Sequence, residues 1–345
     1  MSSNNSVRLA IFGAGGFVGS HLVKCLIANG HEEIYCYDLY DEKLHKIVPS
    51  GGYQFQTLDI RSDDALMQEA IREADIVIDL VAYAQPSIYM DRPIEVVELN
   101  LFDNLKIVDE CIKQKKFLVQ FSTCEVYGKS GGKTEPFKED TTDLIVGPVT
   151  NHRWIYSCAK QLLERMVHAY GLRGDLEYII IRPFNFIGPE MDYLIQSKDE
   201  GTPRVFPGFM SALLYEHTLE VVDGGQNSRT FTYIDDAVEA IVIAINNRDQ
   251  LTNQIVNVGN PQNMITILDL AYLMRSLYAK LTGIEPKSEV SVVSSIDFYG
   301  EGYEDCDWRI PNIDKLANLG WEPRFGLEET LISGMEYYIN TVQPT

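Results

Sequence analysis

Residues 7–19 read VRLAIFGAGGFVG, an apolar run that passes directly into a glycine-rich turn. The following residues, SHLVKCLIANG, carry apolar side chains at helical spacing and stop at a glycine. A strand that enters a helix through a glycine loop brings backbone N–H groups to the start of the helix, where they can bind a phosphate. The spacing of Gly13, Gly16 and Gly19 therefore predicts a strand, a phosphate-binding turn and a helix.

The same alternation of short apolar runs and helical patterns continues along the chain. The expected strands are 32–39, 53–60, 74–82, 115–123 and 176–182, and the expected helices lie near 63–73, 94–114 and 154–170. Such repeating units bury both faces of a parallel sheet. The sequence therefore predicts an α/β fold with a Rossmann-like, doubly wound parallel sheet.

An acidic residue, Asp38, ends the second predicted strand. A carboxylate at this place can accept a hydrogen bond from a ribose 2′-hydroxyl but repels a 2′-phosphate, which predicts NAD rather than NADP as the cofactor. The expected cofactor-binding residues are Gly13, Gly16, Phe17, Val18 and Gly19 in the loop, Asp38 at the ribose, and Asp59 and Ile60 at the adenine. We expect residues 1–185 to form the NAD-binding domain, which also receives strands from about 228–260, and residues 186–345 to form mainly a smaller C-terminal substrate-binding lobe.

A second motif, Tyr156-Ser157-Cys158-Ala159-Lys160, separates a tyrosine and a lysine by one helical turn. A nearby ammonium group favours the phenolate, so we expect Lys160 to lower the pKa of Tyr156 towards that of a useful general base. The strand that ends before Thr123, Cys124 and Glu125 places small polar groups and a carboxylate at the same edge of the sheet, where ligands bind in doubly wound folds.

Composition excludes several classes of partner. The chain of 345 residues has 29 Lys and Arg against 50 Asp and Glu, a formal net charge of −21, which disfavours nucleic acid and anionic membrane surfaces. The six cysteines are scattered without paired spacing, so we expect reduced thiols in a cytoplasmic protein and no metal site. We expect neither a leader sequence nor a membrane span, because no apolar run of about 20 residues occurs.

Together these motifs resemble the extended short-chain dehydrogenase/reductases, the NAD-dependent epimerase/dehydratase family. The resemblance extends over nearly the whole chain through GAGGFVG, STCEVYG, YSCAK, RPFNFIGP and VNVGNP. Two longer segments, LIVGPVTNHRWIYSCAKQLLER (144–165) and FYGEGYEDCDWRIPNI (298–313), are most similar to the UDP-glucuronate decarboxylases and the UDP-apiose/UDP-xylose synthases.

The resemblance implies an enzyme that oxidises the C4 hydroxyl of a nucleotide sugar and decarboxylates UDP-glucuronate. Tyr156 would take the hydroxyl proton, Thr123 would hydrogen-bond the C4 oxygen, and Lys160 would hold the cofactor ribose. Glu125 and Arg309, with Cys124 beside them, would act near the sugar carboxylate. The expected substrate-binding residues are Tyr89, Arg153, Asn185, Arg229, Tyr303 and Arg309. The resemblance also implies a homodimer that pairs the helices near 94–114 and 154–170.

Some alternatives stay open. Ala84 stands where the apiose synthases carry a second cysteine, which favours a UDP-4-keto-pentose or UDP-xylose over UDP-apiose as product. A nucleotide-sugar 4-dehydrogenase or 4-epimerase keeps the C4 oxidation without decarboxylation, and an NAD-binding sensor keeps only the fold. Three residues also allow a purely structural interpretation. Arg309, which lies among acids in the sequence, could form a surface ion pair, and Glu125 could cap a turn. Arg182 could form a structural ion pair with an acid at the edge of the sheet.

Overall fold

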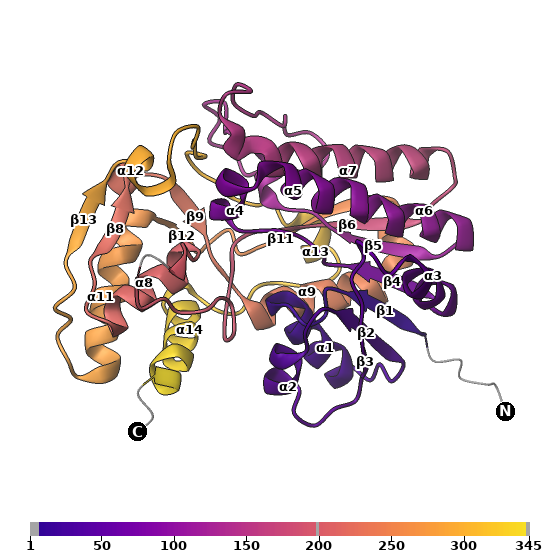
Figure 1. Ribbon diagram of the computed structural model, residues 1–345, viewed down its shortest axis with the longest axis horizontal. Coiled ribbons are helices and arrows are strands. Elements are labelled where there is room, and N and C mark those ends of the chain that lie inside the picture. Colours follow the sequence, from indigo (N-terminus) through magenta and orange to yellow (C-terminus); the bar gives the residue numbers. More distant parts are fainter. Residues whose placement is uncertain (1–6, 198–199, 343–345) are drawn as a thin grey trace.

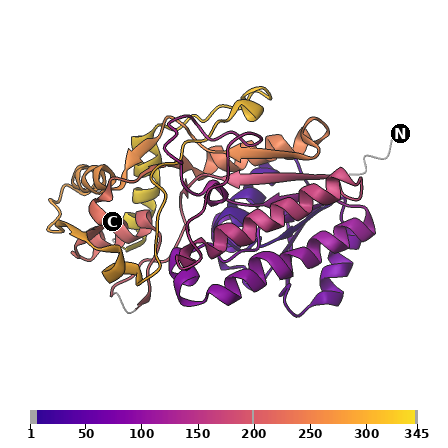
Figure 2. The same ribbon diagram turned by 90° about the horizontal axis from the view of Figure 1, so that it is seen from above.

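The computed structural model describes residues 7–197 and 200–342, which form two lobes that lie side by side (Figures 1 and 2). The larger lobe holds a seven-stranded sheet in the order β11-β6-β5-β4-β1-β2-β3, with every pair of neighbours parallel. Its strands are β1 Leu9–Phe12, β2 Ile34–Asp38, β3 Gln54–Thr57, β4 Ile76–Asp79, β5 Phe117–Phe121, β6 Tyr178–Pro183 and β11 Gln254–Val258. This confirms the Rossmann-like, doubly wound α/β fold.

Helices cover both faces of this sheet (Figure 1). Along β1, Leu9 and Ile11 pack into the core on one face, while Ala10 and Phe12 pack into the core on the other. Because side chains alternate between the faces, a strand covered on both sides reads as one continuous apolar run. One face carries α1 (Phe17–Ala28) and α9 (Ile234–Asn246), and the other carries α3 (Asp64–Glu73), α6 (Asn104–Gln114) and α7 (Ile155–Leu172).

The helix expected near 94–114 is interrupted. The chain forms α4 (Pro86–Asp91), α5 (Pro93–Val97), a π-helical turn η1 (Glu98–Asp103) and then α6. The Asn100 side chain hydrogen-bonds both the N–H and the C=O of Tyr83, and Asn104 Nδ2 donates to the carbonyls of Val81 and Leu99. Such side chains offer the backbone alternative partners, and π-helical turns often mark functional sites.

The smaller lobe is made chiefly from residues after β6 (Figure 1). It contains α8 (Val205–Leu214), β8 (Leu219–Val222), α11 (Ile267–Thr282), β13 (Val290–Val293), α12 (Ser295–Tyr299) and α14 (Leu327–Val342). Two short ladders, β9 (Ser228–Thr230) with β12 (Met264–Thr266) and β7 (Phe186–Ile187) with β10 (Thr232–Tyr233), lie towards the larger lobe. The return of the chain through α9 to β11 agrees with a sheet completed by late residues, and the exact division into domains stays a prediction.

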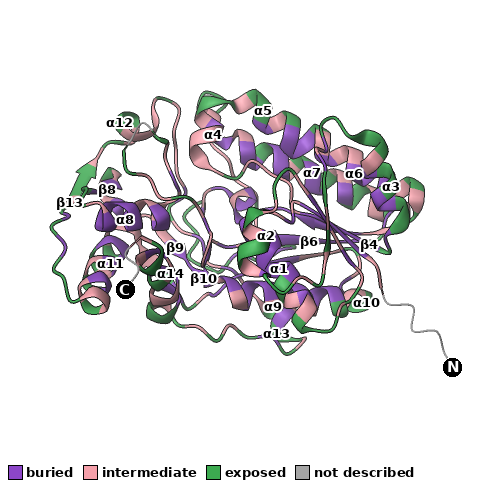
Figure 3. Ribbon diagram, turned by 60° about the horizontal axis from the view of Figure 1, so that its bottom comes forward, coloured by how far each residue is buried: buried purple, intermediate pink, exposed green. Residues whose placement is uncertain are grey.

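The remaining short elements are α2 (Glu42–Ile47), η2 (Cys124–Tyr127), η3 (His152–Trp154), η5 (Asp223–Gly225), α10 (Arg248–Leu251) and α13 (Asp314–Ala317). The inner sides of the helices and the sheet are buried, and the exposed residues lie outside (Figure 3). Among the helices that the structure describes, none combines the length and hydropathy of a membrane-spanning segment.

Candidate active site

The glycine loop between β1 and α1 is shaped by close backbone approaches. Gly13 has a φ of +82°, and a Cβ on Gly19 would lie 2.4 Å from the carbonyl oxygen of Gly13. Gly16 is the N-cap of α1 and provides no side-chain cap, and a Cβ there would meet only the Gly13 carbonyl, at 3.4 Å. The loop therefore leaves the start of α1 open, which fits the pyrophosphate of a dinucleotide. Phe17 is buried in the core, and Val18 packs against it.

Asp38 lies directly beside this loop, as expected for a ribose-binding carboxylate. Its Oδ2 accepts a hydrogen bond from the N–H of Gly15 at 2.9 Å, and its Oδ1 accepts one from Leu39 at 2.7 Å. Burial raises the pKa of Asp38, and these backbone hydrogen bonds oppose the rise. Gly15 is a residue that the sequence analysis did not single out: a Cβ there would lie 1.9 Å from the Tyr40 carbonyl oxygen.

The two residues expected at the adenine, Asp59 and Ile60, differ in how far their side chains are available to a ligand. Asp59 follows β3 and forms an ion pair with Arg61, with 2.7 Å between Oδ2 and Nη2, and this hydrogen bonding lowers its pKa. The side chain of Ile60 is buried in the core on the face of the sheet that α3 covers. Its place at the adenine stays a prediction, and only its backbone is available for that contact.

Tyr156 and Lys160 lie on the inner face of α7 and are both buried. Lys160 Nζ donates to Asn104 Oδ1 and to the carbonyl of Phe121, each at 3.1 Å. Burial raises the pKa of Tyr156, Glu125 adds to the rise, and a hydrogen bond with Thr123 opposes it. The expected lowering of this pKa by Lys160 is therefore wrong for this structure, because burial dominates and the ammonium group is held by Asn104 and Phe121.

Asn104 is a second residue that the sequence analysis missed. It is fully buried at the junction of η1 and α6, and its side chain connects Lys160 to the loop after β4. Its only sequence signal is its position on the helix before β5, since an asparagine on a helix has no characteristic spacing. Tyr89, on α4, stacks on Tyr156 with ring centroids 4.6 Å apart and an interplanar angle of 11°.

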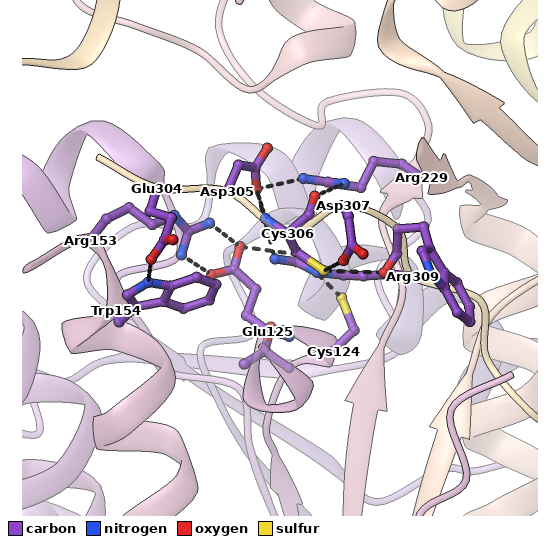
Figure 4. Close-up of polar contacts among 12 residues, drawn as sticks. Cys124, Glu125, Arg153, Trp154, Arg229, Glu304, Asp305, Cys306, Asp307 and Arg309 are labelled. Atoms are coloured by element: carbon purple, nitrogen blue, oxygen red, sulfur yellow. Dashed lines mark hydrogen bonds and ion pairs between the residues drawn. The ribbon is translucent and has the colours of Figure 1, made fainter. Parts of the chain in front are cut away.

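Glu125 lies between two buried arginines (Figure 4). Arg153 forms a bidentate pair with it, with N···O distances of 2.5 and 2.9 Å, and Arg309 Nη1 lies 3.6 Å from its Oε1. Burial acts to raise the pKa of Glu125, but the two guanidinium groups outweigh it and hold the pKa below its ordinary value. Glu125 does not cap the turn η2 (Cys124–Tyr127). The cap is Thr123, whose hydroxyl accepts a hydrogen bond from the Glu125 N–H at 3.1 Å.

Arg309 is only 2% exposed, so its interpretation as a surface ion pair is wrong. Besides Glu125, its Nη1 lies 3.9 Å from the sulfur of Cys124. Its Nε and Nη2 are buried without a hydrogen-bond partner, although Nη2 lies 4.0 Å from Asp305 Oδ1, and the Nε of Arg153 is also without one. Burial raises the pKa of the Cys124 thiol although Arg309 acts against it. Arg182, by contrast, pairs with Glu164 at 2.6 and 2.9 Å, as its structural interpretation predicts.

A cavity of about 790 Å³ extends from this cluster into the smaller lobe. Of the expected substrate-binding residues, its wall includes Arg153, Asn185, Arg229, Tyr303 and Arg309. Its wall also includes Tyr299 and Asp305, which the sequence analysis missed although they belong to the quoted segment 298–313.

The expected substrate-binding residues from the smaller lobe are each held by contacts with neighbouring residues. Arg229 pairs with Asp305 at 2.5 Å and donates to the carbonyls of Ser228 and Cys306. Asn185 has a φ of +38° and donates to the Thr230 carbonyl at 3.1 Å. Tyr303 stacks on Tyr299 with centroids 4.1 Å apart. Within residues 7–197 and 200–342, no three His, Cys, Asp or Glu side chains are grouped to hold a metal ion.

A glycine loop and a Tyr–Lys helix that meet at the carboxyl edge of a parallel sheet define the short-chain dehydrogenase/reductase class of NAD-dependent enzymes. Within that class the particular family is shown by residues 9–259, which match the NAD dependent epimerase/dehydratase family. The chain belongs to this family. This confirms the resemblance and the prediction of an enzyme with NAD as its cofactor.

The chain is similar to named proteins over nearly its full length. It is 41% identical to a UDP-D-apiose/UDP-D-xylose synthase of Oryza sativa subsp. japonica, over 97% of this chain and 90% of that protein. It is 40% identical to UDP-D-apiose/UDP-D-xylose synthase 1 of Arabidopsis thaliana, over 97% and 92%. Among solved structures, the PbgP3 protein of Burkholderia pseudomallei has 33% identity and a TM-score of 0.86, over 98% of each chain.

Proposed function

We propose that the protein is a nucleotide-sugar enzyme that oxidises the C4 hydroxyl of UDP-glucuronate and releases the sugar carboxylate as CO₂. Two relatives of about 40% identity are named for UDP-sugar synthesis, which supports this substrate class. The proposed product is a UDP-4-keto-pentose or UDP-xylose.

The observation that carries the proposal is the set of unpartnered guanidinium donors at the cavity. Arg309 keeps Nε and Nη2 without hydrogen-bond partners, and Arg153 keeps its Nε, although both side chains are buried. An unsatisfied buried charged donor is costly unless a ligand completes its hydrogen bonds. A carboxylate on the substrate would do so with matching charge and geometry.

The contacts of Tyr156, and not its raised pKa, support the oxidation step. Tyr156 would accept the proton of the C4 hydroxyl, and Thr123, already within hydrogen-bonding reach of Tyr156, would orient the C4 oxygen. Lys160, held by Asn104 and the Phe121 carbonyl, would bind the cofactor ribose. NAD, when bound, accepts the hydride from C4.

Decarboxylation follows from the chemistry of the oxidised sugar. A ketone at C4 makes the C5 carboxylate part of a β-keto acid, so the bond between C5 and the carboxyl carbon breaks and its electron pair enters the carbonyl as an enolate. Buried cations stabilise such developing negative charge. Arg309 would hold the carboxylate and then the enolate oxygen. Glu125, which is ionised, would orient a water molecule that gives its proton to C5.

The residue at position 84 bears on the product. Ala84 lines the cavity and offers no thiol, whereas Cys124 is buried beside Arg309. Cys306 is a second buried thiol near Arg309 (Figure 4), but neither thiol lies at position 84, and this supports simple decarboxylation over ring contraction to UDP-apiose. Homodimer formation and a cytoplasmic location also stay predictions.

The test is incubation of the purified protein with NAD⁺ and UDP-glucuronate, with CO₂ release and NADH absorbance followed together. CO₂ with accumulating NADH indicates that the 4-keto-pentose is released, and CO₂ without NADH indicates reduction to UDP-xylose. NADH or an epimerised sugar without CO₂ would favour a 4-dehydrogenase or 4-epimerase instead. Neither product from any UDP-uronic acid would overturn the proposal.

A further inference from the structure

A buried carboxylate, Asp79, lies behind the Tyr–Lys helix and has no part in the chemistry described above. It ends β4 and has no solvent exposure. Its Oδ2 accepts a hydrogen bond from Gln120 Nε2 at 2.8 Å, and its Oδ1 accepts one from the N–H of Val81 at 3.0 Å. An ionised carboxylate is rarely buried unless nearby groups compensate its charge.

Two routes, each made of hydrogen bonds and one step along the backbone, link Asp79 to Lys160. On one side, Gln120 is the β5 neighbour of Asp79, and the next residue, Phe121, offers its carbonyl to Lys160 Nζ at 3.1 Å. On the other side, Asn104 donates to the Val81 carbonyl at 3.2 Å and accepts from Lys160. These hydrogen bonds form one buried network contributed by β4 and the loop after it, β5, α6 and α7.

We propose that Asp79 is a positioning residue that keeps Lys160 charged and oriented for the cofactor through this network. The inference rests on the proposed role of Lys160 at the cofactor ribose and is independent of the identity of the sugar substrate.

The charges around Lys160 support this role. Burial lowers the pKa of Lys160 to about 8, and Asp79 is the larger of the two acidic influences that oppose the drop. The other, Glu164 on α7, is already paired with Arg182 of β6. Burial raises the pKa of Asp79, and Lys160, Gln120 and the Val81 N–H oppose this rise. The other titratable group that faces Asp79 is the buried thiol of Cys111, from α6. Of the two acids that raise the pKa of Lys160, Asp79 is therefore the one that is not also paired with an arginine.

The test compares Asp79→Asn with the native protein in NADH binding, followed by fluorescence between about pH 6.5 and 9.5. Asparagine keeps an acceptor for the Val81 N–H and offers a donor to Gln120 Oε1, which has no partner. The native protein should lose affinity for NADH as the pH rises through about 8, where Lys160 loses its proton. In Asp79→Asn that midpoint should fall by about one pH unit, since a neighbouring opposite charge typically shifts a pKa by that much or more.

The matched control is Asp236→Asn, which removes another fully buried carboxylate, paired with Arg324 instead of Lys160. It should leave the midpoint unchanged. Thermal unfolding checks that each variant is folded, and Asp79→Ser replaces Asp79→Asn if the latter does not fold. A folded Asp79 variant with the native midpoint, or a native affinity that does not change with pH, would overturn the proposal. A native protein that makes no CO₂ from UDP-glucuronate, with the expected fall of the midpoint in Asp79→Asn, would count against the proposed sugar chemistry alone.

Discussion

Arg153 binds both carboxylate oxygens of Glu125, at 2.5 and 2.9 Å, in a site where Arg153 is only 2% exposed. Arg309 approaches the same carboxylate from the loop between α12 and α13, so that one acid is shared by two buried cations. The excess positive charge in this cluster contrasts with a net charge of −21 for the chain. Local charge at the cavity, not the charge of the whole protein, therefore determines which ligand is attracted.

Replacing Glu125 by Gln tests the charge in this cluster through the pH dependence of stability. The pKa of Glu125 lies below its ordinary value, so its ionised form stabilises the fold above about pH 4.5, and this contribution is lost as the pH falls through the lowered pKa. The free energy of unfolding of the native protein should exceed that of Glu125→Gln at pH 7 by about 1–3 kcal/mol. The difference should shrink as the pH is lowered towards 3, as measured by urea denaturation.

The control for this prediction is Glu301→Gln, which changes an exposed carboxylate. Its stability relative to the native protein should change little with pH. A constant difference between native protein and Glu125→Gln across the pH range would contradict the assignment of a lowered pKa.

Tyr156→Phe should abolish the base without disturbing the stacked ring. Turnover should fall by about 10²- to 10⁴-fold, the usual contribution of a general base, while NADH affinity stays near that of the native protein. The matched control is Tyr178→Phe, which removes another buried hydroxyl, the one that hydrogen-bonds His168. That control should retain turnover, and equal losses in both variants would argue against a catalytic role for Tyr156.

Arg309→Met should weaken the binding of an acidic sugar more than that of the cofactor. Removing a buried guanidinium that pairs with a substrate carboxylate costs about 2 kcal/mol or more, which corresponds to a rise of about thirtyfold in the KM for UDP-glucuronate. Steady-state kinetics measure this rise, and Arg324→Met, at an arginine with a 63% exposed side chain, is the control. An unchanged KM with a lower kcat would show that Arg309 acts only after the substrate is bound.

Two glycines of the cofactor loop should respond differently to alanine. Gly19→Ala places a Cβ 2.4 Å from the Gly13 carbonyl oxygen, so the fold should lose about 1–3 kcal/mol of stability. Gly16→Ala meets that oxygen at 3.4 Å and should fold, but its methyl group occupies the approach of the pyrophosphate. Calorimetry should therefore show a stable Gly16→Ala protein with weak NADH binding. Normal NADH affinity in this variant would contradict the placement of the pyrophosphate.

The predicted homodimer can be tested on the outer faces of the two long helical segments. Phe102 is 60% exposed on η1 and Leu162 is 47% exposed on α7. Exposed large apolar side chains of this kind are favourable at subunit interfaces. Light scattering should report a dimer for the native protein and a monomer for Phe102→Asp. The exposed Tyr272→Asp of α11 should remain dimeric, and a monomeric native protein would refute the prediction.

Much of the fold and part of the site could be predicted from the sequence. The glycine loop with Asp38, and the Tyr156–Lys160 spacing, rely on backbone geometry within one or two elements, which short-range patterns encode. The break in the helix at residues 98–103 could not be predicted, because it depends on the hydrogen bonds of Asn100 with the loop at Tyr83. The Tyr156–Lys160 motif predicts the wrong direction for the pKa of Tyr156, because burial, which the motif does not report, outweighs a neighbouring charge.

The parallel sheet, the cofactor loop and the family follow from the sequence, since alternating apolar periods and fixed motif spacings act locally. The burial of Arg309 against Glu125 and Cys124 arises from the folding of distant segments, because Arg309 lies among acids in the sequence. The network that joins Asp79 and Lys160 across four elements has the same origin. The physical reason is that charge becomes influential when it is desolvated, and desolvation depends on which distant segments the fold brings together.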